Sequence, residues 1–207
     1  MPEPVASPGE PGSETYLTRL LTPETWAGFA ALVEANNGVW GGCWCIGFHP
    51  EGISKESTRE GNRAAKRAHV DRGTVHQVLV YDGEECVGWV QFGPPAEVAS
   101  IKNLKAYEKE LVALPDWRIG CVFTGSRHRR HGVARAGLAG ALTEIGRAGG
   151  GVVEAYPEQL DGRPPQRGAF LHTGPETLFE ELGFVRDRRI ATWRWVMRAT
   201  VEDRTPG

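Results

Sequence analysis

Apolar residues along the chain recur with two different periods, and each period predicts a different kind of element. From Thr22 to Gly38 the period is that of a helix, because Thr22-Pro23 is typical of a helix start and Asn36-Asn37-Gly38 of a helix end. The apolar positions of its buried face are Trp26, Phe29, Ala30 and Val33. Ser57 and Glu60 have the spacing of a capping box, which predicts a second, mostly polar helix that ends at Gly73.

Strands are predicted where apolar and polar residues alternate or where β-branched residues cluster. Residues 16–20 form one such strand, and the runs 75–81 and 86–92 are joined through Asp82-Gly83, which tolerates the positive φ angles of a hairpin turn. The later predicted elements are helix 100–114, strand 117–123, helix 131–148, strand 151–156, helix 175–182 and strands 184–188 and 190–198. This order predicts a mixed sheet covered by helices, an α/β or α+β architecture.

Composition narrows the class of protein. The chain has 207 residues, of which 40% are hydrophobic and 24% charged, with a net charge of -2. We expect one folded domain over 14–200, with polar tails at 1–13 and 201–207. The charge balance argues against nucleic-acid or membrane partners, and no apolar run is long enough to span a bilayer, so we expect a cytoplasmic protein. The few cysteines, Cys43, Cys45, Cys86 and Cys121, are expected to be reduced thiols.

The most informative segment runs from Arg127 to Arg135, between a predicted strand and a predicted helix. It contains four arginines and no acidic residue. The helix begins near Gly132, where backbone N–H groups lack partners inside the helix and the positive end of the helix dipole is exposed. Such a helix start binds phosphate, and guanidinium groups add charge-assisted contacts. We therefore predict an anion site; a solvated helix start and a nucleic-acid patch are the alternatives.

The residues Arg129-Arg130-His131-Gly132-Val133-Ala134 resemble the fingerprint of the GNAT superfamily of acyl-CoA-dependent N-acetyltransferases. That fingerprint reads Arg or Gln, two residues, Gly, one residue, then Gly or Ala. The context also resembles the family, since an apolar strand precedes the motif, a long amphipathic helix follows it, and Leu182-Gly183-Phe184 comes later. The resemblance extends over residues 14–198.

The resemblance implies a mixed, mostly antiparallel central sheet flanked by helices and splayed between its fourth and fifth strands. The pantetheine arm of acetyl-CoA, the cosubstrate, would lie in that gap, and no metal is needed. The implied cofactor-binding residues are Val122, Phe123 and Thr124 for pantetheine and Arg129, Arg130, His131, Gly132, Val133 and Ala134 for the pyrophosphate.

For catalysis, the resemblance implies direct attack of an amine on the thioester, which needs a base for the ammonium and an acid for the thiolate. Glu154 and Tyr156 lie two apart on a predicted strand and so share a face, and His172 lies in the loop before the last helix. These three are the catalytic candidates, and each also has a plain structural interpretation. Many family members carry a Tyr where this chain has Phe179, which cannot donate a proton, so the acid is unassigned.

The Gly-, Trp- and Cys-rich stretch 38–56 is interpreted as a loop over the acceptor site. Trp40, Trp44 and Phe48 would shape an apolar acceptor pocket. The alternative is a thiol or zinc site on Cys43, Cys45 and His49, with His69 or His76 completing the ligand set.

The last predicted strand places Trp193, Trp195 and Met197 on one face, as core or as the surface of a homodimer. We expect an N-acetyltransferase that acts on a primary amine of a small molecule or peptide; an inactive CoA-binding sensor is the alternative that Phe179 favours.

Overall fold

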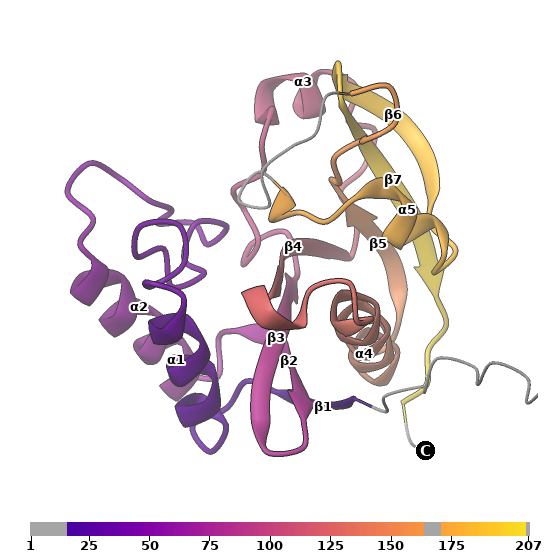
Figure 1. Ribbon diagram of the computed structural model, residues 1–207. Coiled ribbons are helices and arrows are strands. Elements are labelled where there is room, and N and C mark those ends of the chain that lie inside the picture. The colour runs from indigo at the N-terminus through magenta and orange to yellow at the C-terminus, as the bar shows by residue number, and fades with distance from the viewer. Residues whose placement is uncertain (1–15, 164–170, 206–207) are drawn as a thin grey trace, which may run out of the picture.

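The computed structural model describes residues 16–163 and 171–205. Its strands form one seven-stranded sheet in the order β1-β2-β3-β4-β5-β7-β6 (Figure 1). The strands are β1 (Leu17–Leu20), β2 (His76–Asp82), β3 (Glu85–Gly93), β4 (Trp117–Thr124), β5 (Gly151–Ala155), β6 (Val185–Ala191) and β7 (Arg194–Val201). Every neighbouring pair is antiparallel except β4 and β5, which are parallel. The predicted mixed, mostly antiparallel sheet is confirmed.

Helices cover both faces of this sheet, as predicted. They are α1 (Trp26–Ala35), α2 (Arg59–Asp71), α3 (Leu104–Lys109), α4 (Val133–Arg147) and α5 (Glu176–Glu180). In Figure 1, α1 and α2 lie to one side of the sheet and α4 to the other. On the α1 side the core is aromatic: Trp89 stacks on Phe123 with ring centroids 4.2 Å apart and meets Phe29 at 5.2 Å. On the α4 side it is aliphatic, and it includes Leu138 and Ile145. No helix of the described residues is long and apolar enough to cross a membrane.

The sheet is splayed between β4 and β5. Only Trp117 and Arg118 of β4 pair with β5, opposite Val153 and Glu154, so the later residues of β4 have no β5 partner. We call the resulting gap the seam. On the other edge of β4, Ile119 and Val122 pair with β3 residues that are only two apart. Strand β4 therefore carries one extra residue at 120–121, a β-bulge beside the seam.

Several predicted boundaries were wrong, for local reasons. Helix α1 is capped by Thr25 instead of Thr22, and Thr25 Oγ1 accepts a hydrogen bond from the Thr22 N–H at 2.8 Å. Helix α2 is capped by Thr58, whose hydroxyl accepts from the Gly61 N–H at 3.0 Å, instead of by Ser57. Helix α3 ends at Lys109 instead of 114, and Val112 is fully exposed.

The last strand begins at residue 194, so Trp193 lies in the turn before it. Met197 is buried in the core, and Trp195 packs against the same cluster. Arg194 is also buried, because it is paired with Glu158 and donates to the Tyr156 carbonyl. Core packing therefore accounts for Met197 and Trp195. The hairpin of β2 and β3, with Gly83 at φ 56°, matches its prediction.

Candidate active site

A cleft of about 390 Å³ opens at the seam. We call it the seam cleft. Its walls are the end of β4, the start of α4, the loop after α1 and the loop before α5. The lining residues are Asn36, Val39, Trp40, Val122, Phe123, Thr124, Arg129, Arg130, Ala134, Leu171, Gly174 and Pro175. Six of the predicted cofactor-binding residues thus share one cleft, although they come from β4, α4 and the turn between them.

The chain passes from β4 into α4 through two residues with positive φ. Arg130 has φ 65°, and Gly132, which caps α4, has φ 86°. Glycine tolerates this conformation at little cost, whereas other residues are strained there. The turn leaves the first N–H groups of α4 without partners inside the helix. Val133 is buried against Val80 and Val87, which anchors the helix start to the sheet. His131 and Gly132 are exposed beside the seam cleft, and neither lines it.

The arginines at this junction divide into two groups. Arg127 forms an ion pair with Glu85 at 3.1 Å, and Arg135 one with Glu181 at 3.4 Å. Among the residues that the structure describes, no carboxylate pairs with Arg129 or Arg130. Those two guanidinium groups are therefore available to an anion in the seam cleft.

A second cavity, of about 540 Å³, lies on the other side of Trp40. We call it the acceptor cavity. Its lining residues are Trp40, Cys43, Cys45, Gly47, Phe48, Ile53, Ser100, Ile101, Lys102, Cys121 and His172. The His172 ring lies 5.2 Å from the Trp40 ring, which lines both spaces, and 5.9 Å from the Phe48 ring.

Trp40 and Phe48, which the sequence assigns to one pocket, both line this cavity. Trp44, assigned to the same pocket, does not line it. Trp44 is buried in the core and stacks on Trp26 with ring centroids 5.9 Å apart. Ile101 and Lys102 also line this cavity; the sequence predicts both inside a helix over 100–114, whereas α3 begins only at Leu104.

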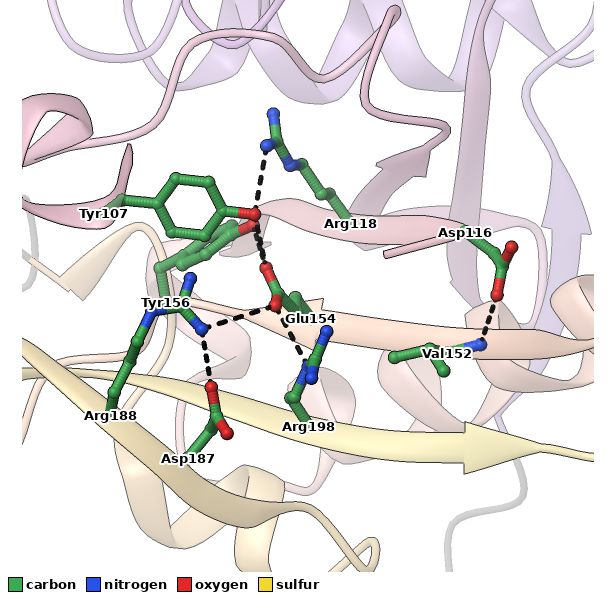
Figure 2. Close-up of polar contacts among 9 residues, drawn as sticks. All are labelled: Tyr107, Asp116, Arg118, Val152, Glu154, Tyr156, Asp187, Arg188 and Arg198. Carbon is green, nitrogen blue, oxygen red and sulfur yellow. Dashed lines mark hydrogen bonds and ion pairs between the residues drawn. The ribbon is translucent and has the colours of Figure 1, made fainter. Parts of the chain in front are cut away.

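Glu154 and Tyr156 lie in a buried polar cluster, shown in Figure 2. Glu154 accepts hydrogen bonds from the hydroxyls of Tyr107 at 2.8 Å and Tyr156 at 3.0 Å, and it forms an ion pair with Arg198 at 3.0 Å. Burial raises the pKa of Tyr156 well above its ordinary value, although the positive charge of Arg118 works against this. Neither Glu154 nor Tyr156 lines the seam cleft or the acceptor cavity. Of the three catalytic candidates, only His172 lines one of these spaces, the acceptor cavity.

Phe179 is fully buried and packs edge-on against Phe184, with ring centroids 5.3 Å apart. Its ring is a core side chain, and it offers no proton to a leaving thiolate.

The histidines of the alternative metal site are arranged differently from the prediction. Ligand atoms of His49, Glu51 and His69 lie within 4.8 Å of one another, and the cysteines are not part of that group. The Lys66 ammonium lies 3.3 Å from His49 Nε2 and would repel a cation there. Burial and this neighbouring charge lower the pKa of His49 to about 2. His76 instead pairs with Glu97 at 2.6 Å.

No family model matches the sequence, and no curated protein matches it. Solved structures do match the fold. A GNAT-family protein from Desulfovibrio desulfuricans is 15% identical, with a TM-score of 0.52 over 90% of this chain and 99% of that one. A protein from Salmonella typhimurium, solved with its cofactor acetyl-CoA, is 15% identical, with a TM-score of 0.51 over 92% of this chain and 96% of that one. A GNAT-family acetyltransferase from Bacillus cereus is 10% identical, with a TM-score of 0.51 over 90% of this chain and 97% of that one. With its splayed β4–β5 pair and the helix start beside it, this chain has the GNAT fold.

Proposed function

We propose that this protein is an acetyl-CoA-dependent N-acetyltransferase that acts on a primary amine of a small molecule or peptide. The observation that carries the proposal is the seam cleft. In it, the part of β4 that does not pair with β5 faces the same space as Arg129 and Arg130, which have no carboxylate partner among the described residues. A strand edge offers N–H and C=O groups to the amide-rich pantetheine arm, and the α4 start with Arg129 and Arg130 suits a pyrophosphate. The comparison structure solved with acetyl-CoA supports the same cosubstrate.

We assign the amine substrate to the acceptor cavity. Its walls are mostly apolar and aromatic, which favours an amine attached to an apolar or aromatic group. Direct attack by the amine on the thioester carbonyl is the simplest route, and it requires a base for the ammonium proton. His172 is our candidate for that base, since it lines the acceptor cavity and its ring packs against Trp40, which lines both spaces. Glu154 and Tyr156 remain alternatives only if a proton reaches their buried cluster through a relay.

Calorimetric titration with acetyl-CoA tests the proposal. The protein is first confirmed by mass spectrometry to be free of bound CoA. Wild-type protein should bind at micromolar concentration, and the double variant Arg129→Ala/Arg130→Ala should bind at least roughly tenfold more weakly, because each charge-assisted contact contributes about 1.5 kcal/mol or more. Arg127→Ala is the matched control, since that residue is paired with Glu85, and it should bind normally. No binding by the wild-type protein would refute the proposal.

A further inference from the structure

Lys102 is the only lysine, arginine, aspartate or glutamate among the described residues that line the acceptor cavity. It lies in the segment before α3, and its neighbours along the chain fix that segment. The Ser100 N–H donates to the Phe48 carbonyl at 3.1 Å, and Ile101 is buried in one cluster with Tyr107. Lys102 itself is exposed. Its backbone is therefore fixed at the cavity wall, and its side chain is accessible to a ligand.

Lys102 has no carboxylate partner of its own within 16–163 and 171–205. The carboxylate whose charge acts on it most strongly is that of Glu158, and both oxygens of Glu158 are already paired. Arg194 pairs with Oε1, and Arg163 pairs with Oε2 at 2.9 Å. Three cations thus share one carboxylate, which leaves the surroundings of Lys102 with an excess of positive charge.

This excess also acts on the protonation of Lys102. Burial and the charge of Arg194 lower the pKa of Lys102, and Glu158 opposes them only in part. A further anion beside Lys102 would favour its charged form. The site therefore suits a ligand that brings its own negative charge.

The rest of the cavity suits the apolar part of such a ligand. Trp40, Phe48, Ile53 and Ile101 contribute aromatic and aliphatic surface. The volume of about 540 Å³ lies within the range of about 300–1,000 Å³ that is typical of sites for one small molecule. A second ammonium group on the acceptor would meet no acidic side chain among the described lining residues, and Lys102 would repel it.

We infer that the acceptor is a small amine that carries a carboxylate on an apolar or aromatic body, and that Lys102 binds this carboxylate. This inference rests on the proposed function and names its substrate class. The Lys102 ammonium donates to the carboxylate beside a mostly apolar wall, where a charge pair is screened less than in bulk water. Lys102 is thus a specificity-determining residue. It holds the end of the acceptor that does not react, and the amine attacks the thioester directly.

Matched pairs of amines test the inference. A benzylamine with a para carboxylate and the same benzylamine with a para carboxamide have similar shapes and similar amine basicities, but differ by one negative charge. A second such pair has a straight alkyl chain in place of the ring. With acetyl-CoA, wild-type protein should show a kcat/KM roughly three- to tenfold higher for the carboxylate of at least one pair, mostly through KM. Raising the salt concentration from about 0.05 to 0.5 M should reduce this ratio.

Variants of Lys102 assign the preference to one side chain. Lys102→Met removes the charge and should bring the ratio close to one, because kcat/KM falls for the carboxylate and is unchanged for the carboxamide. Lys102→Glu should invert the ratio. The matched control is Lys105→Met, since Lys105 is exposed on α3 and does not line the cavity, and it should keep the wild-type ratio. Because each ratio is taken within one protein, a general loss of activity cancels.

A binding measurement separates this inference from the proposed function. Calorimetric titration of both benzylamines into protein without acetyl-CoA should show tighter binding of the carboxylate, and Lys102→Met should abolish the difference. If amines are acetylated with the same ratio in wild-type and Lys102→Met protein, the inference is overturned and the proposed function stands. If acetyl-CoA does not bind, the proposed function fails. Binding of the carboxylate that depends on Lys102 would then still support the ligand class, and binding that ignores Lys102 would overturn it.

Discussion

The backbone N–H of Val122 donates a 2.7 Å hydrogen bond to the carbonyl oxygen of His172. Val122 lies on the free edge of β4, at the position where the proposed pantetheine arm would bind. The loop before α5 therefore occupies a backbone donor that we propose for the cosubstrate. If acetyl-CoA binds as proposed, this bond is exchanged for one to the ligand.

Hydrogen–deuterium exchange of backbone amides should detect this change of hydrogen-bond partner at Val122. On addition of acetyl-CoA, amides of residues 171–174 should exchange faster, because their loop leaves β4, while those of 121–124 should remain protected. The Arg129→Ala/Arg130→Ala protein at the same ligand concentration is the control and should change less. Increased protection of both segments would show that the loop stays in place.

Gly132→Ala should weaken acetyl-CoA binding and destabilise the fold by about 1 kcal/mol, because an alanine is strained at φ 86°. An added Cβ would have its nearest neighbour, Tyr16, at 4.0 Å, so crowding is not the cause. Gly73→Ala is the matched control: Gly73 has φ 65° with nothing within 4 Å and lies at the end of α2. Denaturant titration should show similar losses for both variants, and calorimetry should show weaker binding for Gly132→Ala alone. Normal binding by Gly132→Ala would contradict a phosphate site at this turn.

Glu154→Gln should lower the free energy of unfolding. The carboxylate is fully buried and forms ion pairs with Arg198 at 3.0 Å and Arg188 at 3.9 Å. Removing its charge leaves two partly buried guanidinium groups without their counter-charge, which should cost about 1–3 kcal/mol, less than the loss for a fully buried pair. Urea unfolding measures the loss, with Glu34→Gln, an exposed partner of Arg63, as the control. A large fall in kcat at unchanged stability would instead return Glu154 to the role of base.

Stability should fall in mild acid because of His49. Its pKa is lowered from 6.5 to about 2 in the folded protein, so between those two values the unfolded chain binds the extra proton. The free energy of unfolding therefore falls as pH decreases below 6.5, by about 1.4 kcal/mol per pH unit from this group alone. His49→Phe should remove that part of the slope between pH 6 and 5, measured by urea unfolding at each pH. An unchanged slope would mean that another group controls the acid response.

The sequence predicted the parts of the molecule that depend on local pattern. The turn at Gly132 and the arginines beside it could be found because a strand, a glycine with positive φ and an amphipathic helix follow one another along the chain. The β2–β3 hairpin was predictable for the same reason, through Asp82-Gly83.

The sequence could not predict which side chains meet across the sheet. Cys45 and Cys121 come from a loop and a strand far apart in the sequence, yet both line the acceptor cavity. The burial of Lys66 was also unexpected. Its helix is polar and basic in composition, which predicts an exposed side chain, yet Lys66 is fully buried. Trp44 was assigned to the acceptor cavity because its neighbours Trp40 and Phe48 are there, but its own backbone turn directs it to Trp26.

The bond from Val122 to His172 also bears on how the protein behaves when it has no ligand. Where β4 and β5 part, the sheet has a strand edge in its interior, and an unpaired edge is a template for another polypeptide. The carbonyl of His172 covers one donor of that edge with the chain's own backbone. The loop before α5 thus leaves one donor fewer on that edge for another polypeptide to pair with.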